Sequence, residues 1–329
     1  MTQKILVTGG AGYVGSHFLH HMASIGQPRD RFVVFDNLTN GNLDLIEGFP
    51  FVEGDLRNKP QVKDLFAKHD FSHVVHFASS CYVGESYENP SLYFENNLIG
   101  AMNLLATMAE MNCRKLVFSS SCAIYGVPKN QKITEETPKK PANPYGETKL
   151  IIETLLKWHS QIHGIQSVSL RYFNAAGAGF GVGERHNPET HLIPLAIKAA
   201  LDPQFSLVVY GQDFPTSDGT CIRDFVHVCD LALAHDQALN YLTNGGKTIG
   251  INLGSGAGNS VLQIIALINR ISGKKVKYRF GPRRAGDPPK LVANVKEAQR
   301  VLMWRPRMDI EKIISTALEW HTSQQEIHR

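Results

Sequence analysis

The residues with the clearest chemical potential are a tyrosine and a lysine four positions apart, Tyr145 and Lys149. They follow Pro144 at the start of a predicted helix, so the two side chains share one face. A phenol has a pKa near ~10 and is a poor base at neutral pH, but nearby positive charge favours the phenolate. Lowering this pKa by about three units requires roughly 4 kcal/mol, which two close cations in a partly dry site can supply. The pair therefore predicts a general base for a hydroxyl proton.

A glycine-rich turn containing Gly9, Gly12 and Gly15 follows a predicted strand and opens a helix. This spacing is a variant of the dinucleotide-binding fingerprint, whose glycines permit a tight turn and close approach of the backbone to a pyrophosphate. The helix N-terminus would offer free N–H groups to the phosphates. Asp36 ends the second strand 21 residues after Gly15, where a carboxylate would bind ribose hydroxyls. Because it would repel a 2′-phosphate and is followed by Asn37, the pattern predicts NAD rather than NADP; the alternative is a tight turn without a cofactor.

Two further strand ends carry polar residues. Asp55 and Leu56 follow a third short strand, where the carboxylate could accept a hydrogen bond from an adenine amino group. Ser119, Ser120 and Ser121 lie directly after another predicted strand. Ligands of a doubly wound sheet bind at the carboxyl ends of its strands, so we expect the serines and the tyrosine–lysine pair to face one crevice.

The elements that would position these residues alternate between apolar runs and helical patterns. Such runs suit a parallel sheet covered on both faces, and the alternation predicts a doubly wound α/β (Rossmann) fold with right-handed crossovers. The predicted strands cover residues 5–7, 32–35, 73–77, 116–118 and 168–170, and the helices between them cover residues 14–25, 91–111 and 145–163.

The second half of the chain differs from the first in composition. Long loops rich in Gly, Pro and polar residues are predicted at 177–188, 211–219 and 281–289, between helices at 192–201, 229–242, 260–272 and 309–323. Loops of this length are usually functional or disordered. We expect an NAD-binding domain over residues 1–175, with a later segment near 226–252 packing back on it, and a smaller α/β substrate lobe over residues 176–329.

Two predicted helices, over residues 91–111 and 145–163, carry apolar residues on more than one face. A helix of this kind has a second apolar surface beyond the stripe that faces its own core. The pattern therefore predicts either a surface that contacts a partner or complete burial within one chain.

Composition excludes several classes of protein. With 43% hydrophobic residues among 329 the chain is not disordered or fibrous, and a formal charge of +4 is a poor signature of nucleic-acid binding. No apolar stretch approaches the ~18 residues of a membrane span, and a strand rather than a signal peptide begins at Lys4. Five scattered cysteines predict neither a disulfide framework nor a zinc site and fit a reducing cytosol. The fourteen histidines are interpreted as solvated or cap-forming, so no metal is expected.

The glycine turn, Ser121 and Tyr145-x-x-x-Lys149 together resemble the extended short-chain dehydrogenase/reductase family, and in particular its nucleotide-sugar 4-epimerases. The resemblance covers almost the whole chain. Its further motifs are Val83-Gly84-Glu85-Ser86, Asn96-Asn97, Tyr125-Gly126, Asn143-Pro144-Tyr145-Gly146, Leu170-Arg171-Tyr172-Phe173-Asn174, Asp218-Gly219-Thr220, Arg223-Asp224, His227-Val228 and Pro282-Arg283-Arg284-x-Gly286-Asp287. The resemblance implies a cytoplasmic, homodimeric isomerase of galactose metabolism that interconverts UDP-glucose and UDP-galactose through a 4-keto sugar, with tightly bound NAD.

The resemblance also implies a role for individual residues. Tyr145 would be the base and acid at the sugar 4-hydroxyl, Lys149 would bind the nicotinamide ribose and tune Tyr145, and Ser121 would relay the proton. Arg223 and Arg284 would grip the diphosphate, which suits a guanidinium fork. The implied cofactor contacts are Gly9, Gly12, Tyr13, Val14, Gly15, Asp36, Asn37, Asp55, Leu56, Phe77, Ala78, Asn96, Ser119, Tyr145, Lys149 and Tyr172. The implied substrate contacts are Ser121, Tyr145, Asn174, His191, Leu192, Tyr210, Arg223, Arg284, Asp287 and Leu291.

Other activities differ from this one at identifiable positions. Cys122 and Ala123 stand where related dehydratases carry an Asp-Glu pair and decarboxylases a Glu, which favours an epimerase. A UDP-glucuronate 4-epimerase stays an alternative because it needs the same oxidation at C4. A cofactor-sensing binding protein would usually lose the tyrosine–lysine pair, and a steroid-type dehydrogenase/isomerase would have an apolar C-terminus.

Four positions bear on the details of recognition. Cys81 stands where the family usually has Lys, His191 replaces Asn and Phe225 replaces Tyr, which leaves contacts of the nicotinamide and the nucleotide open. Leu291 falls where a large Tyr in some relatives blocks N-acetylated sugars. UDP-N-acetylhexosamines are therefore further candidate substrates.

Overall fold

The main body of the protein is a seven-stranded parallel sheet. The computed structural model describes residues 3–128, 132–284 and 286–327. The sheet strands are β1 (Lys4–Thr8), β2 (Phe32–Asp36), β3 (Phe51–Glu53), β4 (Phe71–His76), β5 (Lys115–Ser121), β6 (Gln166–Tyr172) and β11 (Ile249–Leu253). Their order is β11-β6-β5-β4-β1-β2-β3, so the direction of winding reverses between β1 and β4. The predicted doubly wound α/β fold is confirmed, with ligands expected at this reversal.

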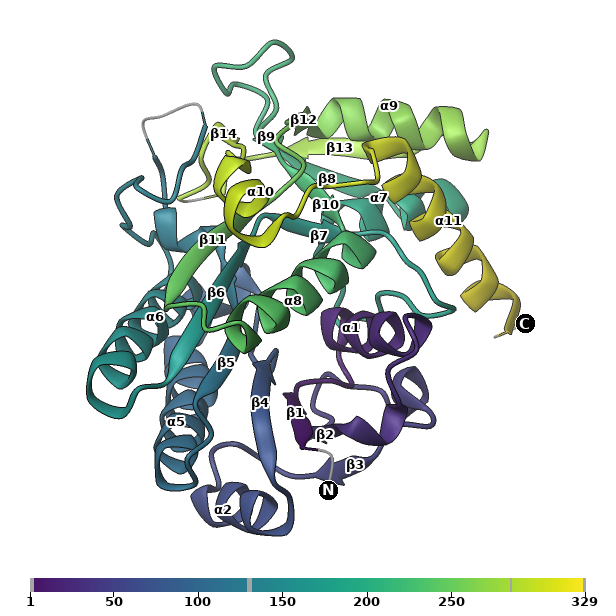
Figure 1. Ribbon diagram of the computed structural model, residues 1–329. Coiled ribbons are helices and arrows are strands. Elements are labelled where there is room, and N and C mark those ends of the chain that lie inside the picture. The colour runs from purple at the N-terminus through teal and green to yellow at the C-terminus, as the bar shows by residue number, and fades with distance from the viewer. Residues whose placement is uncertain (1–2, 129–131, 285, 328–329) are drawn as a thin grey trace.

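Helices cover both faces of the sheet (Figure 1). On one face lie α1 (Tyr13–Ser24), α8 (Val228–Thr243) and α10 (Lys296–Leu302), and on the other lie α2 (Lys59–Lys68), α5 (Gly100–Glu110) and α6 (Pro144–His163). Phe18 and Leu231 belong to the apolar cluster of the first face, and Leu104 and Leu156 to that of the second. Each such buried side chain contributes about 1.5–3 kcal/mol, which explains why the strands between the two clusters are apolar runs.

The helix expected over residues 91–111 is divided. It consists of α4 (Pro90–Tyr93), a π-helical stretch over Phe94–Ile99, and α5, with the short α3 (Val83–Glu88) before it. A π turn inserts one extra residue and is often found at functional sites. The insertion lies at the Asn96-Asn97 pair, whose side chains turn toward the end of β4.

The smaller lobe lies above the carboxyl ends of the strands in Figure 1. Its helices are α7 (Leu192–Leu201), α9 (Val261–Ser272) and α11 (Ile310–Ile327), packed around a third apolar cluster. Its short strands are β7 (Asn174–Ala176), β8 (Leu207–Tyr210), β9 (Ile222–Arg223), β10 (Phe225–His227), β12 (Asn259–Ser260), β13 (Tyr278–Gly281) and β14 (Lys290–Leu291). The sequence sets the ends of α9, because Ser260 and Gln263 form a capping box and Gly273 adopts the left-handed conformation after the last turn.

The chain returns to the sheet after it has entered the smaller lobe. Strand β11 pairs in parallel with β6 along its whole length and becomes the edge of the sheet. The sequence prediction did not include β11 as a strand, and it also missed α2, α3 and α10. Of the helices in the described residues, none combines the length and apolar character needed to cross a bilayer. All five cysteines are free thiols.

Candidate functional site

Tyr145 and Lys149 lie on the first turns of α6, beside the carboxyl end of β5. The helix begins there because Asn143 caps it, accepting a hydrogen bond from the Gly146 N–H at 2.8 Å, and because a proline occupies its first position. Lys149 is only 3% exposed, and its ammonium donates to the Ser119 carbonyl oxygen at 2.8 Å. The Lys149 nitrogen is 5.7 Å from the centroid of the Tyr145 ring, so the pair shares one face of the helix.

Burial shifts the pKa of both groups, but not in the direction expected for the tyrosine. Burial lowers the pKa of Lys149 to about 7. Burial also raises the pKa of Tyr145 well above its ordinary value, a rise to which the Cys81 thiol adds and which a hydrogen bond with Ser121 opposes. In the chain alone, desolvation of the phenol is therefore the dominant effect on its pKa. A lowered phenol pKa requires a further positive charge close to Tyr145.

Strand β5 ends in three serines, two of which lie against this pair. The Ser119 hydroxyl makes a hydrogen bond with the Tyr172 hydroxyl, so these predicted cofactor contacts lie together. The Ser121 oxygen accepts a hydrogen bond from a backbone N–H of the short helix that follows, and the hydroxyl lies close enough to Tyr145 to lower the pKa of its phenol. Ser121 and Tyr145 are thus placed to contact one substrate hydroxyl together.

The third serine belongs to a buried polar network that the sequence analysis missed. Ser120 donates at 2.6 Å to the Glu153 carboxylate, which makes a buried ion pair with Arg171 at 2.7 Å. Arg171 also donates to the Tyr125 hydroxyl at 2.9 Å, and that hydroxyl donates to Asn252 on β11 at 2.7 Å. Buried ion pairs of this kind are retained when their hydrogen bonds are complete, as they are here. The network fixes β5, β6, β11 and α6 together behind the site.

The glycine turn is packed so closely against neighbouring backbone that a side chain would not fit at two of its positions. Gly9 has a φ of +70°, and a Cβ there would lie 2.4 Å from the Ala78 backbone nitrogen. A Cβ at Gly15 would lie 2.5 Å from the Gly9 carbonyl oxygen. Helix α1 begins after Gly12, which has no side chain with which to cap it, so the first N–H groups stay available to an anion. These features fit a dinucleotide pyrophosphate.

Neighbouring backbone contacts hold this turn in place. The N–H groups of Phe77 and Ala78 both donate to the Thr8 carbonyl oxygen, at 2.8 and 3.1 Å. On the first turn of α1, the buried Tyr13 donates its hydroxyl to the Gly177 carbonyl oxygen at 2.5 Å, while Val14 is half-buried. The turn is thereby tied both to β4 and to the loop that leads to the smaller lobe.

Asp36 lies at the end of β2, next to the glycine turn. Its carboxylate accepts hydrogen bonds from the N–H groups of Ala11 at 3.1 Å and Leu38 at 2.9 Å. Burial raises the pKa of this carboxyl group, and those two hydrogen bonds counteract the rise. A carboxylate has about four acceptor sites, so two remain for ribose hydroxyls.

Asp55 is more strongly engaged than the sequence suggested. Hydrogen bonds from Arg57, against an opposing effect of burial, lower the pKa of the Asp55 carboxyl to about 2, and Asn37 donates to it at 3.1 Å. Leu56 is buried beside the start of α5. The structure therefore brings Asn37 and Asp55, both predicted to contact the cofactor, together. Arg57 also binds Asp55, which the sequence did not indicate.

The π-helical stretch contributes one predicted and one missed residue. Asn96 donates to the Ser80 hydroxyl at 3.0 Å. Asn97 is fully buried, accepts from the Ser80 N–H at 2.8 Å and donates to the Thr148 hydroxyl at 3.2 Å. Asn97 thus connects the segment after β4 to the helix that carries Tyr145 and Lys149, and the adjacent Asn-Asn pair was its signal in the sequence.

The predicted diphosphate residues gather in the smaller lobe. Arg223 makes an ion pair with Asp287, and the Arg284 guanidinium lies 4.0 Å from the centroid of the Tyr210 ring. Both arginines also lie close enough to the Cys221 thiol to affect its pKa. The structure therefore brings these predicted residues together as two pairs in one lobe, and Arg223 is already paired.

The remaining predicted substrate residues lie at element ends of the smaller lobe. Asn174 donates to the Asp224 carbonyl oxygen at 2.8 Å, and Leu291 is buried. His191 and Leu192 begin α7. Burial raises the pKa of Cys122 to about 12, so this thiol is not an acid or base at neutral pH. Phe225 is buried in the apolar cluster of the smaller lobe, where the hydroxyl of a Tyr would need a partner.

Comparison with known proteins agrees with this geometry. The model of the NAD dependent epimerase/dehydratase family matches residues 5–254. UDP-glucose 4-epimerase from Rhizobium leguminosarum bv. trifolii is 44% identical over 97% of this chain and 97% of its own. The crystal structure of UDP-glucose 4-epimerase from Brucella ovis in complex with NAD is 43% identical, with a TM-score of 0.92 over 97% of this chain and 98% of that one. The UDP-Glc/GlcNAc 4-epimerase from the human pathogen Campylobacter jejuni is 38% identical, with a TM-score of 0.85 over 98% and 99%. The chain belongs to the NAD dependent epimerase/dehydratase family.

Proposed function

We propose that this protein is a UDP-hexose 4-epimerase that interconverts UDP-glucose and UDP-galactose with tightly bound NAD. The observation that carries the proposal is the Tyr145–Lys149 pair beside the end of β5, with Ser121 close to Tyr145 and the glycine turn at the same edge of the sheet. The full-length similarity to UDP-glucose 4-epimerases supports it.

The glycine turn, Asp36 and Lys149 would hold NAD, which would supply a reversible hydride acceptor and a positive charge. The phenol of Tyr145 is too weak an acid in the chain alone, so the phenolate forms only when that charge is present. Tyr145 then takes the 4-hydroxyl proton, with Ser121 bonded to the same oxygen. The hydrogen bond from Lys149 to the Ser119 carbonyl oxygen fixes the ammonium near Tyr145, where it would contact the nicotinamide ribose.

The smaller lobe would hold the UDP group while the 4-keto sugar turns over. Arg223 would exchange its pairing with Asp287 for the diphosphate, and Arg284 would add a second guanidinium. Tyr210, on which Arg284 rests, would line the uracil pocket. From their positions in the family resemblance, we infer that Asn174 and Leu192 also contact the sugar nucleotide.

The absence of acid chemistry at Cys122 and Ala123 favours epimerisation over water loss. Cys122 holds its proton because burial raises its pKa to about 12, and Ala123 has no titratable group. Deprotonation at the sugar C5 has no agent in these two residues. Epimerisation oxidises C4 and then reduces it again, so it needs no base at C5.

The buried Leu291 leaves more space than a Tyr would, so we extend the proposed substrates to UDP-N-acetylhexosamines. The similar Campylobacter jejuni protein is a UDP-Glc/GlcNAc 4-epimerase. In this assignment residues 1–175 and about 226–252 form the NAD-binding part, and the rest of 176–329 binds the UDP-sugar.

We also propose a cytoplasmic homodimer. Helices α5 and α6 bury one face each against the sheet but expose apolar side chains on another, with Trp158 58% and Ile162 68% exposed. Met102 on α5 is exposed as well. A second copy that covers these faces would remove them from water. The five free thiols fit the reducing cytosol.

The test is a coupled assay in which UDP-galactose is supplied and UDP-glucose is detected by its oxidation. The wild-type chain should form UDP-glucose, and Tyr145→Phe should lower kcat by roughly 10²–10⁴-fold while UDP binding, measured by calorimetry, is retained. Tyr278→Phe, which changes an exposed tyrosine, is the control. Near-normal turnover in Tyr145→Phe would refute the assignment. Exclusive conversion of UDP-glucuronate would identify the protein as a UDP-glucuronate 4-epimerase instead.

A further inference from the structure

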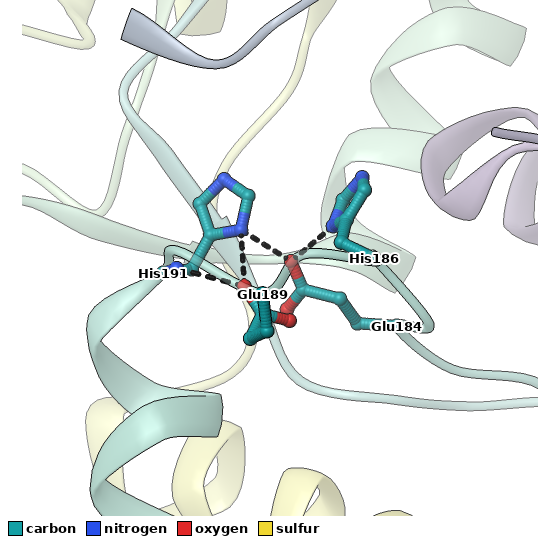
Figure 2. A group of neighbouring side chains, drawn as sticks. All are labelled: Glu184, His186, Glu189 and His191. Atoms are coloured by element: carbon teal, nitrogen blue, oxygen red, sulfur yellow. Dashed lines mark hydrogen bonds and ion pairs between the residues drawn. The ribbon is translucent and has the colours of Figure 1, made fainter. Parts of the chain in front are cut away.

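A cluster of two histidines and two glutamates lies in the loop that leads to α7. Glu184, His186, Glu189 and His191 turn their side chains toward one point, as Figure 2 shows. One ligand atom from each residue lies within 4.8 Å of all the others. These are the donor atoms that bind transition metals in proteins, and they come from a single stretch of eight residues.

The two carboxylates crowd one imidazole nitrogen. Glu184 Oε1 and Glu189 Oε1 each lie 2.8 Å from His191 Nδ1, and Glu184 Oε1 also lies 2.7 Å from His186 Nδ1. An imidazole nitrogen carries at most one proton, so it cannot satisfy two carboxylates fully. The Glu184 side chain is only 5% exposed, so water does little to separate the two negative charges. A cation bound between the carboxylates would remove this repulsion.

A buried phenol without a partner lies against the same cluster. The Tyr82 hydroxyl has no hydrogen-bond partner among the residues that the structure describes, and Tyr82 is only 7% exposed. Its ring lies edge-on to His186, with centroids 5.6 Å apart, and 6.4 Å from the ring of His191. Burial raises the pKa of this phenol, and the charges of Cys81, Glu189 and Glu184 add to the rise, so its proton stays in place. The hydroxyl is available to a ligand of the cluster, such as a metal-bound water.

The donor set identifies the class of metal. Two imidazole nitrogens with two carboxylate oxygens suit Zn²⁺ and its neighbours, whereas Mg²⁺ and Ca²⁺ prefer oxygen ligands alone. Zinc bonds of about 2.0–2.2 Å in a tetrahedron would hold neighbouring ligand atoms about 3.4 Å apart. The present separations of 2.7–2.8 Å are those of hydrogen bonds, so an opening of about 0.6 Å would let the ion replace the shared protons.

We propose that Glu184, His186, Glu189 and His191 form a site for one divalent transition-metal ion of the Zn²⁺ class. Two neutral imidazoles, two carboxylates and the ion together carry no net charge, which suits a site whose first ligand, Glu184, is buried and whose other ligands are partly buried. The ion would close the loop over residues 184–191 into a rigid unit and fix the start of α7. Its role is structural, since all four ligands come from the chain.

The competing state is a metal-free network with both imidazoles protonated, which is also neutral. Burial lowers the pKa of His186, but hydrogen bonds with Cys81 and with the Glu184 carboxylate outweigh this effect and raise the pKa to about 9, so His186 holds its proton when no metal is present. The two states differ in what the protein binds. The test therefore measures metal directly rather than activity.

The experiment uses the full chain without an affinity tag, stripped with a chelator and titrated with Co²⁺ and then with Zn²⁺. We expect one equivalent of Co²⁺ with the visible absorption of a four-coordinate site, its displacement by one Zn²⁺, and one zinc per chain by elemental analysis. Glu184→Gln and His186→Gln keep the side-chain size and should each weaken Zn²⁺ binding by at least about 100-fold, since even partners outside the ligand shell cost 10–100-fold. Zinc should also raise the Tm of the wild type but not of either variant.

His163→Ala is the matched control. His159 and His163 stand one turn apart on α6 with ring centroids 5.1 Å apart, and such a pair can bind Co²⁺ or Zn²⁺ on a helix surface. Retained binding in His163→Ala together with loss in Glu184→Gln supports the proposed site. Loss in His163→Ala with retention in Glu184→Gln, or less than half an equivalent of zinc in the wild type at 0.1 mM free metal (an order-of-magnitude threshold), overturns it.

Discussion

Burial of Lys149 makes the stability of the cofactor-free protein depend on pH. Lys149 has an ordinary pKa of 10.5, which burial lowers to about 7 in the folded chain. Between these values the unfolded chain holds a proton that the folded chain has released. Folding stability therefore rises with pH across this window, and the cost of the buried ammonium is largest below pH 7.

The size of the effect follows from the shift. One pKa unit corresponds to 1.36 kcal/mol, so the charged lysine costs roughly 5 kcal/mol at pH 6 and about 1 kcal/mol at pH 10. The substitution Lys149→Met keeps the length of the side chain and removes the charge. We expect this variant to be more stable than the wild type at pH 6, with an advantage that shrinks by roughly 4 kcal/mol by pH 10.

The assay is urea unfolding of cofactor-free protein, followed by tryptophan fluorescence at several values between pH 6 and pH 10. Lys157→Met is the control, because Lys157 is an exposed lysine on the same helix, α6. A difference between the wild type and Lys149→Met that stays constant over this range would refute the reasoning, since it would mean that the ammonium is not desolvated.

Three further predictions concern the cofactor cradle and the outer face of α6. Gly15→Ala would place a Cβ 2.5 Å from a backbone oxygen, so we expect a loss of about 1–3 kcal/mol of stability and of NAD binding in calorimetry, whereas Gly84→Ala, with nothing within 4 Å, should change neither. Asp36→Asn should weaken NAD by about 10–100-fold, because a charge-assisted hydrogen bond contributes about 1.5–3 kcal/mol; an affinity within twofold of the wild type would contradict the ribose assignment. Ile162→Glu should convert the proposed dimer to a monomer in sedimentation, and an unchanged mass would argue against that interface.

The parts of the fold that local rules determine could be predicted. Helix α7 begins and ends at Leu192 and Leu201, as expected from its apolar period, and α6 starts at Pro144, one residue before the predicted start at Tyr145. Helix α2 was missed because Asn58 caps a short, mostly polar segment whose only strong signal is a few buried apolar residues. Strand β11 was missed because its partner, β6, lies about 80 residues earlier in the chain.

The same distinction holds for the site. The spacing of Tyr145 and Lys149 on a helix places them together regardless of what surrounds the helix. The raised pKa of Tyr145 could not be predicted, because it depends on how deeply the phenol is buried by the assembled protein. Nor could the bonds of Asn97, since they join segments that are far apart in sequence. The Glu184–His191 cluster was overlooked because a loop has no period that would show which side chains converge.

Because β11 forms the edge of the sheet but comes late in the sequence, the sheet can be completed only late in synthesis. The ribosome completes β6 at Tyr172 but must add a further 81 residues before Leu253, the last residue of β11, exists. At about 5–20 residues per second this takes roughly 4–16 s, during which the edge of β6 has no strand beside it. A nascent chain with an open strand edge can pair with another chain. Chaperone capture or aggregation of this protein should therefore be most frequent in ribosome-bound chains whose synthesis has passed residue 172 but not residue 253.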